Sequence, residues 1–235
     1  MKIKYSFLLL MALAIGLASC GYDNYDAPES MLQGNVVYNG EAIHVATNEV
    51  SIELWEPGWQ LSNRIDVAVA QDGSYSARLF NATYKMVFRD NQGPFIMNMN
   101  PETDSDTILV NLNGDLVMDI EVLPYYMIRT PAFTASGNTV TATANVEKII
   151  TNENARDVER VSLYLNKTQF VDSRGNYNIA RTDIAGGSIP DLSNINLSVE
   201  APDLNPPQSY IFARIGVKIQ GVEHMIFSPV QRIDL

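Results

Sequence analysis

The chain has 235 residues, a formal net charge of −11 at pH 7 and a pI near 4.5. This acidic balance excludes nucleic acid, and the charged surface of an anionic membrane, as partners held by electrostatic attraction. Hydrophobic residues make up 46% of the chain and aromatic residues 9%, enough for a globular core, and the length allows one large or two small domains.

The first residues have the features of an export signal. Lys2 and Lys4 form a short positive segment, and residues 6–18 are apolar and uncharged. A helix of this length spans about 20 Å, short of the ~30 Å hydrocarbon core of a bilayer, so a signal peptide fits better than a membrane span. The stretch ends Leu17-Ala18-Ser19-Cys20, which resembles the bacterial lipobox.

Cys20 is the only cysteine of the chain and lies where the lipobox requires it. A thiolate is the nucleophile that takes up the diacylglycerol, so we expect residues 1–19 to be removed and Cys20 to be lipidated. Each buried CH₂ of the acyl chains contributes about 0.8 kcal/mol, which makes the lipid the membrane partner of the protein. The alternative is a plain secretory peptide with an accidental cysteine.

Residues 20–31 are polar and acidic, with a proline at position 28, and we predict that they form a flexible tether. The acidic patch from Asp23 to Glu29 resembles the surface-export signal of Bacteroidetes lipoproteins. That resemblance implies an outer-membrane protein exposed at the cell surface.

Short alternating runs fill residues 32–124 and predict β-strands. Asn39-Gly40, Pro57-Gly58 and Asp72-Gly73 supply turns between them. In one run Val50, Ile52 and Leu54 share a face, and Trp55 lies on the other. The predicted strands are 32–38, 49–55, 64–70, 74–80, 83–89, 108–112 and 117–123.

Pro124 and Pro131 interrupt this pattern, and a second series of strands is expected to begin near Ala132. Residues 151–158 lack an extended apolar period and are predicted to be a loop. The sequence therefore predicts an all-β fold with two antiparallel β-sandwich domains in tandem, at 32–124 and 125–235. The strands of the second series are predicted at 139–146, 159–165, 194–199, 209–219, 224–227 and 230–233.

Part of the first domain is similar to transthyretin-like or carboxypeptidase-regulatory-like domains. In those domains an Asp-Gly-x-aromatic turn comes before one strand, and the strand that pairs with it carries a tyrosine. The chain departs from this pattern before that tyrosine, where Asn81-Ala82-Thr83 replaces the usual glycine. The residues that carry the similarity are Leu32-x-Gly34-x-Val36-x-Tyr38-x-Gly40, Gln71-Asp72-Gly73-Ser74-Tyr75 and Tyr84.

The whole mature chain resembles a Bacteroidetes lipoprotein family of unknown function, domain-of-unknown-function family 3823. Asp23-Asn-Tyr-Asp-Ala-Pro28, Gly93-Pro94-Phe95 and Val122-Leu-Pro-Tyr-Tyr126 carry much of the resemblance. It implies a regulatory-like N-terminal domain, an immunoglobulin-like C-terminal domain and genes beside glycan-uptake systems of the starch-utilisation type. It thus implies outer-membrane glycan-uptake proteins as partners, and none of its motifs is catalytic.

The sequence offers no recognisable catalytic set. His44 and His224 are the only histidines and are expected in different domains, and HExxH, GxSxG and phosphate-binding glycine loops are absent. No cofactor is expected. A glycosidase needs only two carboxylates about 5–10 Å apart, so that alternative stays open among 27 acidic residues.

Metal and glycan binding are the remaining site hypotheses. Glu102, Asp104 and Asp106 could offer oxygen ligands to Ca²⁺, but the segment lacks the glycine and distal glutamate of an EF-hand, so a solvated acidic loop is the preferred interpretation and no metal is predicted. Sugar rings stack on exposed aromatic faces. The candidate glycan-binding residues are Trp55, Trp59, Tyr125 and Tyr126.

We therefore predict a non-catalytic surface lipoprotein that is an accessory glycan-binding or scaffolding component of a polysaccharide-utilisation system. The alternative is a structural spacer that binds another protein and no sugar. The two differ in the exposure of Trp55 and Trp59, because a binding platform needs these rings in solvent and a spacer would bury them.

Overall fold

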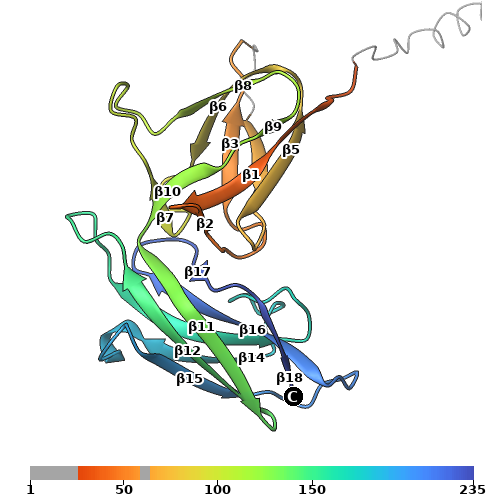
Figure 1. Ribbon diagram of the computed structural model, residues 1–235, viewed down its shortest axis with the longest axis vertical. Coiled ribbons are helices and arrows are strands. Elements are labelled where there is room, and N and C mark those ends of the chain that lie inside the picture. The colour runs from red at the N-terminus through yellow and green to blue at the C-terminus, as the bar shows by residue number, and fades with distance from the viewer. Residues whose placement is uncertain (1–25, 59–63) are drawn as a thin grey trace, which may run out of the picture.

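The computed structural model describes residues 26–58 and 64–235, and Figure 1 shows two β-domains arranged end to end. The described residues form eighteen strands and one 3₁₀ turn, Gly186–Ser188, and contain no α-helix. This confirms the all-β prediction, with antiparallel sheets in two domains. No helix in the described part of the chain has the length and apolar character needed to cross a membrane. The predicted signal peptide, Cys20 and Trp59 lie outside the described residues.

The N-terminal domain consists of two sheets around a common core, and most of its strands lie where the alternating pattern predicts them. Val50, Ile52 and Leu54 are 0% exposed, which confirms the predicted inner face. One sheet contains β1 (Ser30–Tyr38), β2 (Glu41–Ala42), β5 (Ser74–Leu79), β7 (Phe95–Met97), β9 (Leu116–Val117) and β10 (Ile120–Pro124). The other contains β3 (Ser51–Trp55), β4 (Arg64–Ala68), β6 (Ala82–Phe88) and β8 (Ile108–Leu112).

Strand β1 is an exception to the predicted antiparallel pairing. It pairs antiparallel with β5 but parallel with β9 and β10, and the strand predicted at 117–123 is split in two. The split occurs where the chain passes β1 at Gly34. The two backbones are so close there that a Cβ on residue 34 would lie 1.8 Å from the carbonyl oxygen of Met118. The hydroxyl of Tyr75 donates to the same oxygen at 2.6 Å. Glycine at position 34 therefore permits the close approach of the two backbones.

The other residues that resemble regulatory-like domains also have structural roles. Gly73 has φ +85° in the turn before β5, and a Cβ there would lie 2.6 Å from the carbonyl oxygen of Ile43. The hydroxyl of the buried Tyr84 donates to the carbonyl oxygen of Phe80 at 2.9 Å. These residues hold turns and strand ends together, and we assign them no part in a binding site.

The C-terminal domain also has two sheets. The first contains β11 (Tyr126–Ser136), β12 (Thr139–Lys148) and β15 (Ile195–Glu200), all antiparallel. The second contains β13 (Val158–Asn166), β14 (Ala180–Ala185), β16 (Tyr210–Ile219), β17 (Ile226–Phe227) and β18 (Gln231–Asp234).

The start of the second series of strands was predicted too late. β11 begins at Tyr126 rather than near Ala132, because Pro131 lies in a bulge between Arg129 and Ala132 and does not end the strand. Thr130 adopts φ +46° there. Strands β7 and β14 were not predicted either. β7 is only three residues long, and the alternation of β14 is weak because all six of its residues are partly or fully exposed.

The two domains share one continuous hydrophobic core. Its buried residues run from the N-terminal sandwich through Tyr125 and Tyr126 into the C-terminal sandwich. Only Tyr125 separates β10 from β11, and its carbonyl oxygen accepts a hydrogen bond from the backbone N–H of Ile149 at 3.0 Å. The chain thus passes between the domains without a flexible linker.

Candidate functional site

Loops of the N-terminal domain pack on the outer face of the β13–β16–β17 sheet. Ala46 joins a second buried cluster there with Tyr164, Val171, Met225 and Phe227 of the C-terminal domain. Consecutive residues of β13 and β16 are consequently buried, because both faces of that part of the sheet are covered. Backbone hydrogen bonds close the contact, including Phe227 N–H to the carbonyl oxygen of His44 at 2.9 Å.

Arg214 lies at the centre of this contact and is 0% exposed. Its guanidinium donates to the carbonyl oxygens of Val45 and Gln71 in the N-terminal domain, at 3.1 and 3.0 Å, and to those of Val171 and Ser228 in its own domain, at 3.2 and 2.9 Å. Burial lowers the pKa of Arg214 to about 9, so the side chain still carries its charge at neutral pH. A single buried cation therefore joins the two domains.

Charged side chains extend the contact around Arg214. Glu49 of the N-terminal domain accepts from Arg174 at 2.7 Å and pairs with His224 at 3.1 Å. Arg89 pairs with Glu223 across the same interface. These pairs and the buried cluster fix how the domains sit relative to each other.

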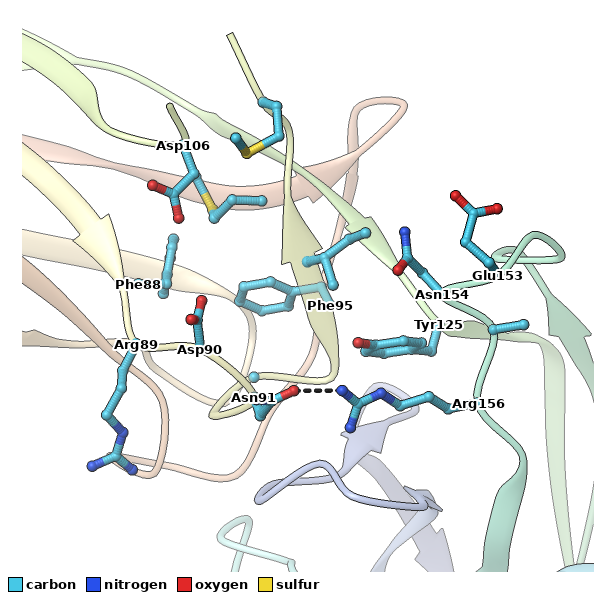
Figure 2. Close-up of a pocket in the computed structure, with 15 residues that line it drawn as sticks. Phe88, Arg89, Asp90, Asn91, Phe95, Asp106, Tyr125, Glu153, Asn154 and Arg156 are labelled. Atoms are coloured by element: carbon cyan, nitrogen blue, oxygen red, sulfur yellow. Dashed lines mark hydrogen bonds between the residues drawn. The ribbon is translucent and has the colours of Figure 1, made fainter. Parts of the chain in front are cut away.

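The fixed junction creates a groove of about 470 Å³ that both domains line. In Figure 2, Asp90 and Asp106 lie on one side and Glu153 and Asn154 on the other, with the ring of Phe95 between them. Carboxylates and amides over an apolar floor can accept and donate hydrogen bonds to a ligand rich in hydroxyl groups.

Arg156 closes one end of this groove. Its guanidinium donates to Asn91 Oδ1 at 2.6 Å, the dashed contact in Figure 2, and to the carbonyl oxygen of Gly221 at 2.7 Å. It also lies over the ring of Tyr125, 5.4 Å from the centroid. Because three partners hold it, Arg156 shapes the groove more than it offers a free charge.

The predicted aromatic residues do not assemble into one platform. Tyr125 and Tyr126 are 3% and 1% exposed, because the chain runs directly from β10 into β11 and packs both rings into the shared core. Tyr125 nevertheless lines the junction groove, whereas Tyr126 does not, and the role of both rings in binding stays a prediction. Trp55 is partly buried on the outer face of β3, and its Nε1 donates to Glu53 at 3.3 Å, so its role in binding stays a prediction.

The acidic loop separates into residues with different surroundings. Glu102 and Asp104 are exposed in a turn, whereas Asp106 is partly buried and lines the groove. Among the described residues there is no group of three or more His, Cys, Asp or Glu side chains placed to hold a metal ion. Asp106 thus belongs with the groove.

Arg214, Arg156 and Asn91 were not identified from the sequence. An arginine inside the apolar run of β16 was a detectable signal: it alternates with the core residues Ala213 and Ile215, and a charged side chain in so apolar a strand needs partners if its outer face is covered. Arg156 and Asn91 had no such signal, since they meet only through the docking of the domains.

Both histidines also lie at the interface, although 180 residues separate them. Burial is the main cause that lowers the pKa of His44 and of His224 below 6.5. For His44, the charge of Arg214 is a further cause, and for His224 the pairing with Glu49 acts in the opposite direction. His44 Nδ1 lies 3.3 Å from the carbonyl oxygen of Gln71, which Arg214 also contacts, and His224 pairs with Glu49, so each belongs to the contact between the domains.

These shifts predict that the protein loses stability on mild acidification. Each histidine has a lower pKa in the folded protein than in the unfolded chain, where it is near 6.5. As the pH falls below about 6.5 the unfolded chain takes up protons first, so stability is lost until the pH reaches the pKa of the folded state. We expect the free energy of unfolding, measured in urea from pH 7.5 to 5, to decrease below about pH 6.5. The double variant His44→Gln/His224→Gln should show a smaller decrease, and an equal slope in both proteins would contradict the prediction.

The comparisons with known proteins follow the same division into domains. The model of the DUF3823 N-terminal domain, a family of unknown function, matches residues 30–123, and that of the DUF3823 C-terminal domain matches residues 126–232. The chain belongs to the DUF3823 family. This confirms the family resemblance predicted from the sequence. None of the curated proteins is significantly similar to the chain.

Solved DUF3823 structures share this architecture. A DUF3823 protein of Parabacteroides merdae is 31% identical with a TM-score of 0.75, over 89% of this chain and 100% of its own. One from Bacteroides ovatus is 30% identical with a TM-score of 0.74, over 88% and 100%. A third protein, from Bacteroides uniformis, carries the name "putative carbohydrate binding protein"; it is 21% identical with a TM-score of 0.70, over 88% and 100%, and shows the shared fold.

Proposed function

We propose that this chain is a non-catalytic, lipid-anchored protein of the outer cell surface that binds polysaccharide as an accessory of a glycan-uptake system. The observation that carries the proposal is the groove at the domain junction, where Asp90, Asp106, Glu153 and Asn154 surround an apolar floor. Its mixed lining matches a sugar, which offers hydroxyl groups at its edge and C–H groups on its faces.

The location rests on the sequence. The lipobox-like stretch before Cys20 and the acidic patch after it support lipidation and export to the surface. The name of the Bacteroides uniformis relative agrees with carbohydrate as the ligand class. The setting beside outer-membrane uptake proteins remains part of the proposal.

Binding can be measured on a soluble protein of residues 21–235, since every described strand lies between Ser30 and Asp234. We expect affinity electrophoresis in gels with embedded plant and host polysaccharides to retard this protein with at least one polymer. We then expect Glu153→Ala/Asn154→Ala to weaken that binding at least tenfold, or about 1.4 kcal/mol. Both side chains are exposed, so the fold should tolerate their loss.

The matched control is Asn138→Ala/Asp203→Ala, an exposed amide and carboxylate at the other end of the C-terminal domain. Asn138 follows β11, and its carbonyl oxygen accepts from the N–H of Ala201, which places both residues far from the junction. Loss of binding in the control alone, or retardation by no polymer, would contradict the proposal. Release of reducing ends from a bound polymer would instead support the glycosidase alternative.

The spacer alternative is favoured by one observation, the rigid contact through Arg214 and the shared core. A spacer needs rigidity and no groove chemistry. If the protein bound none of the polymers and the anchored chain captured one outer-membrane protein, the spacer alternative would be favoured over glycan binding.

A further inference from the structure

A second groove, of about 810 Å³, adjoins the junction groove. It lies between β8, at the edge of one sheet of the N-terminal domain, and β7 and β10 of the other sheet. Met97, Met99 and Asp106 line both grooves. The two grooves therefore adjoin at these three side chains, and together we call them the path.

The path is open because two strand edges flank it. Among the described strands, β8 pairs only with β6, and β7 pairs only with β10. The connection from β7 to β8 turns back on itself, with a single bridge between Asn100 and Ser105, and supplies several residues that line the groove. A ligand could therefore enter the path between the two strand edges.

The second groove repeats the mixed chemistry of the first. Met97, Ile108 and Met118 supply apolar surface, and Asn98 and Thr107 supply polar groups beside it. An alternation of this kind along a groove suits a chain of sugar rings, each with apolar faces and a polar edge.

A row of side chains continues from this groove toward Trp55. Leu109 pairs with Lys85, and Lys85 pairs with Trp55, so the three lie side by side on the outer face of the sheet. Neighbouring strands are about 4.8 Å apart, which places Trp55 about 10 Å from Leu109. Leu109 is 64% exposed, so the row is accessible where it meets the groove.

The charges along the path select against acidic ligands. Five carboxylates line the two grooves against three basic side chains. Arg89 is also paired with Glu223, whereas Arg156 bonds to neutral groups and keeps its charge, so the lining carries a net negative charge. Because the whole chain is also acidic, a uronate or sulfated polymer would be repelled. The carboxylates are Asp90, Asp106, Asp119, Glu121 and Glu153.

We propose that the path from the junction groove to Trp55 binds a stretch of an uncharged polysaccharide that is several sugars long. The inference rests on the proposed function and adds to it the charge of the ligand and the length of chain that the site contacts.

The test compares polymers and lengths. Affinity electrophoresis with neutral probes (xyloglucan, galactomannan, amylopectin) and acidic probes (polygalacturonate, alginate, chondroitin sulfate) should retard the protein with a neutral polymer only. Calorimetry with oligosaccharides cut from that polymer should show affinity rising at least tenfold from two to six sugars. Affinity that is already full for a disaccharide would overturn the inference and leave the proposed function standing.

Variants of the second groove test the path itself. Leu109→Ser changes a side chain that is 64% exposed and lines the second groove but not the junction groove, so the fold and the junction groove should be retained. We expect at least fivefold weaker binding of the six-sugar ligand and unchanged binding of the two-sugar ligand. Val117→Ser is the matched control, because Val117 is 72% exposed and lies outside both grooves.

The outcomes separate the two proposals. Preference for an acidic polymer, or equal binding of the six-sugar ligand by Leu109→Ser and by Val117→Ser, overturns the inference alone. Retardation by no polymer overturns the proposed function and the inference together. Length-dependent binding of a neutral polymer that is weakened in Leu109→Ser and not in Val117→Ser supports both.

Discussion

Replacing Arg214 with methionine should lower the free energy of unfolding by about 3–5 kcal/mol, the range seen when one partner is removed from a buried charged network. Methionine retains much of the length and volume of the side chain but none of its donors. The carbonyl oxygens of Val45, Gln71, Val171 and Ser228 would each lose a hydrogen bond inside the interface. Urea unfolding followed by circular dichroism measures the loss.

The same variant should also separate the two domains. The native protein is expected to unfold in one transition because the core and interface are continuous, whereas Arg214→Met should show a second, earlier calorimetric transition. Arg181→Met is the control, since that arginine is half exposed on β14, and should change stability by no more than about 0.5 kcal/mol. A loss below about 1 kcal/mol in Arg214→Met would show that the carbonyl groups find other donors.

Gly34→Ala should destabilise the N-terminal domain by about 3 kcal/mol or more, at the upper end of what overpacking costs. The added Cβ would lie 1.8 Å from the carbonyl oxygen of Met118, and both atoms belong to backbones that cannot rotate away. We expect the parallel pairing of β1 with β9 and β10 to open, and with it the hydrogen bond from Tyr75. Hydrogen exchange should become faster in these strands.

Gly187→Ala is the matched control for this change. Nothing lies within 4 Å of a Cβ at Gly187, and its φ is not positive. Alanine there should be neutral or stabilise slightly by restricting the unfolded chain, by about 0.4–1 kcal/mol. If Gly34→Ala unfolded at the same urea concentration as Gly187→Ala, the close approach at Met118 would not be a requirement of the fold.

The candidate site was less predictable than the strands. Asp106 was noted in the sequence only as part of an acidic loop, and the structure separates it from Glu102 and places it in a groove. Tyr125 and Tyr126 were named from the sequence as candidate glycan-binding residues, and the direct passage from β10 to β11 buries most of both rings. In each case the local sequence shows which residue types are present. How exposed their side chains are depends on how the neighbouring segments and domains pack, which the local sequence does not show.

The sequence by itself determined the all-β character, the inner faces of most strands and the turns at Asn39-Gly40 and Asp72-Gly73. These depend on alternation and on backbone preferences of neighbouring residues, which act over a few positions. Only the tertiary structure decided the parallel pairing at Gly34, the burial of Arg214 and the grooves at the junction. Each joins segments far apart in the sequence, such as Gly34 and Met118 within the N-terminal domain or Arg214 and Val45 across the interface. The energies of these contacts arise only when those segments pack together.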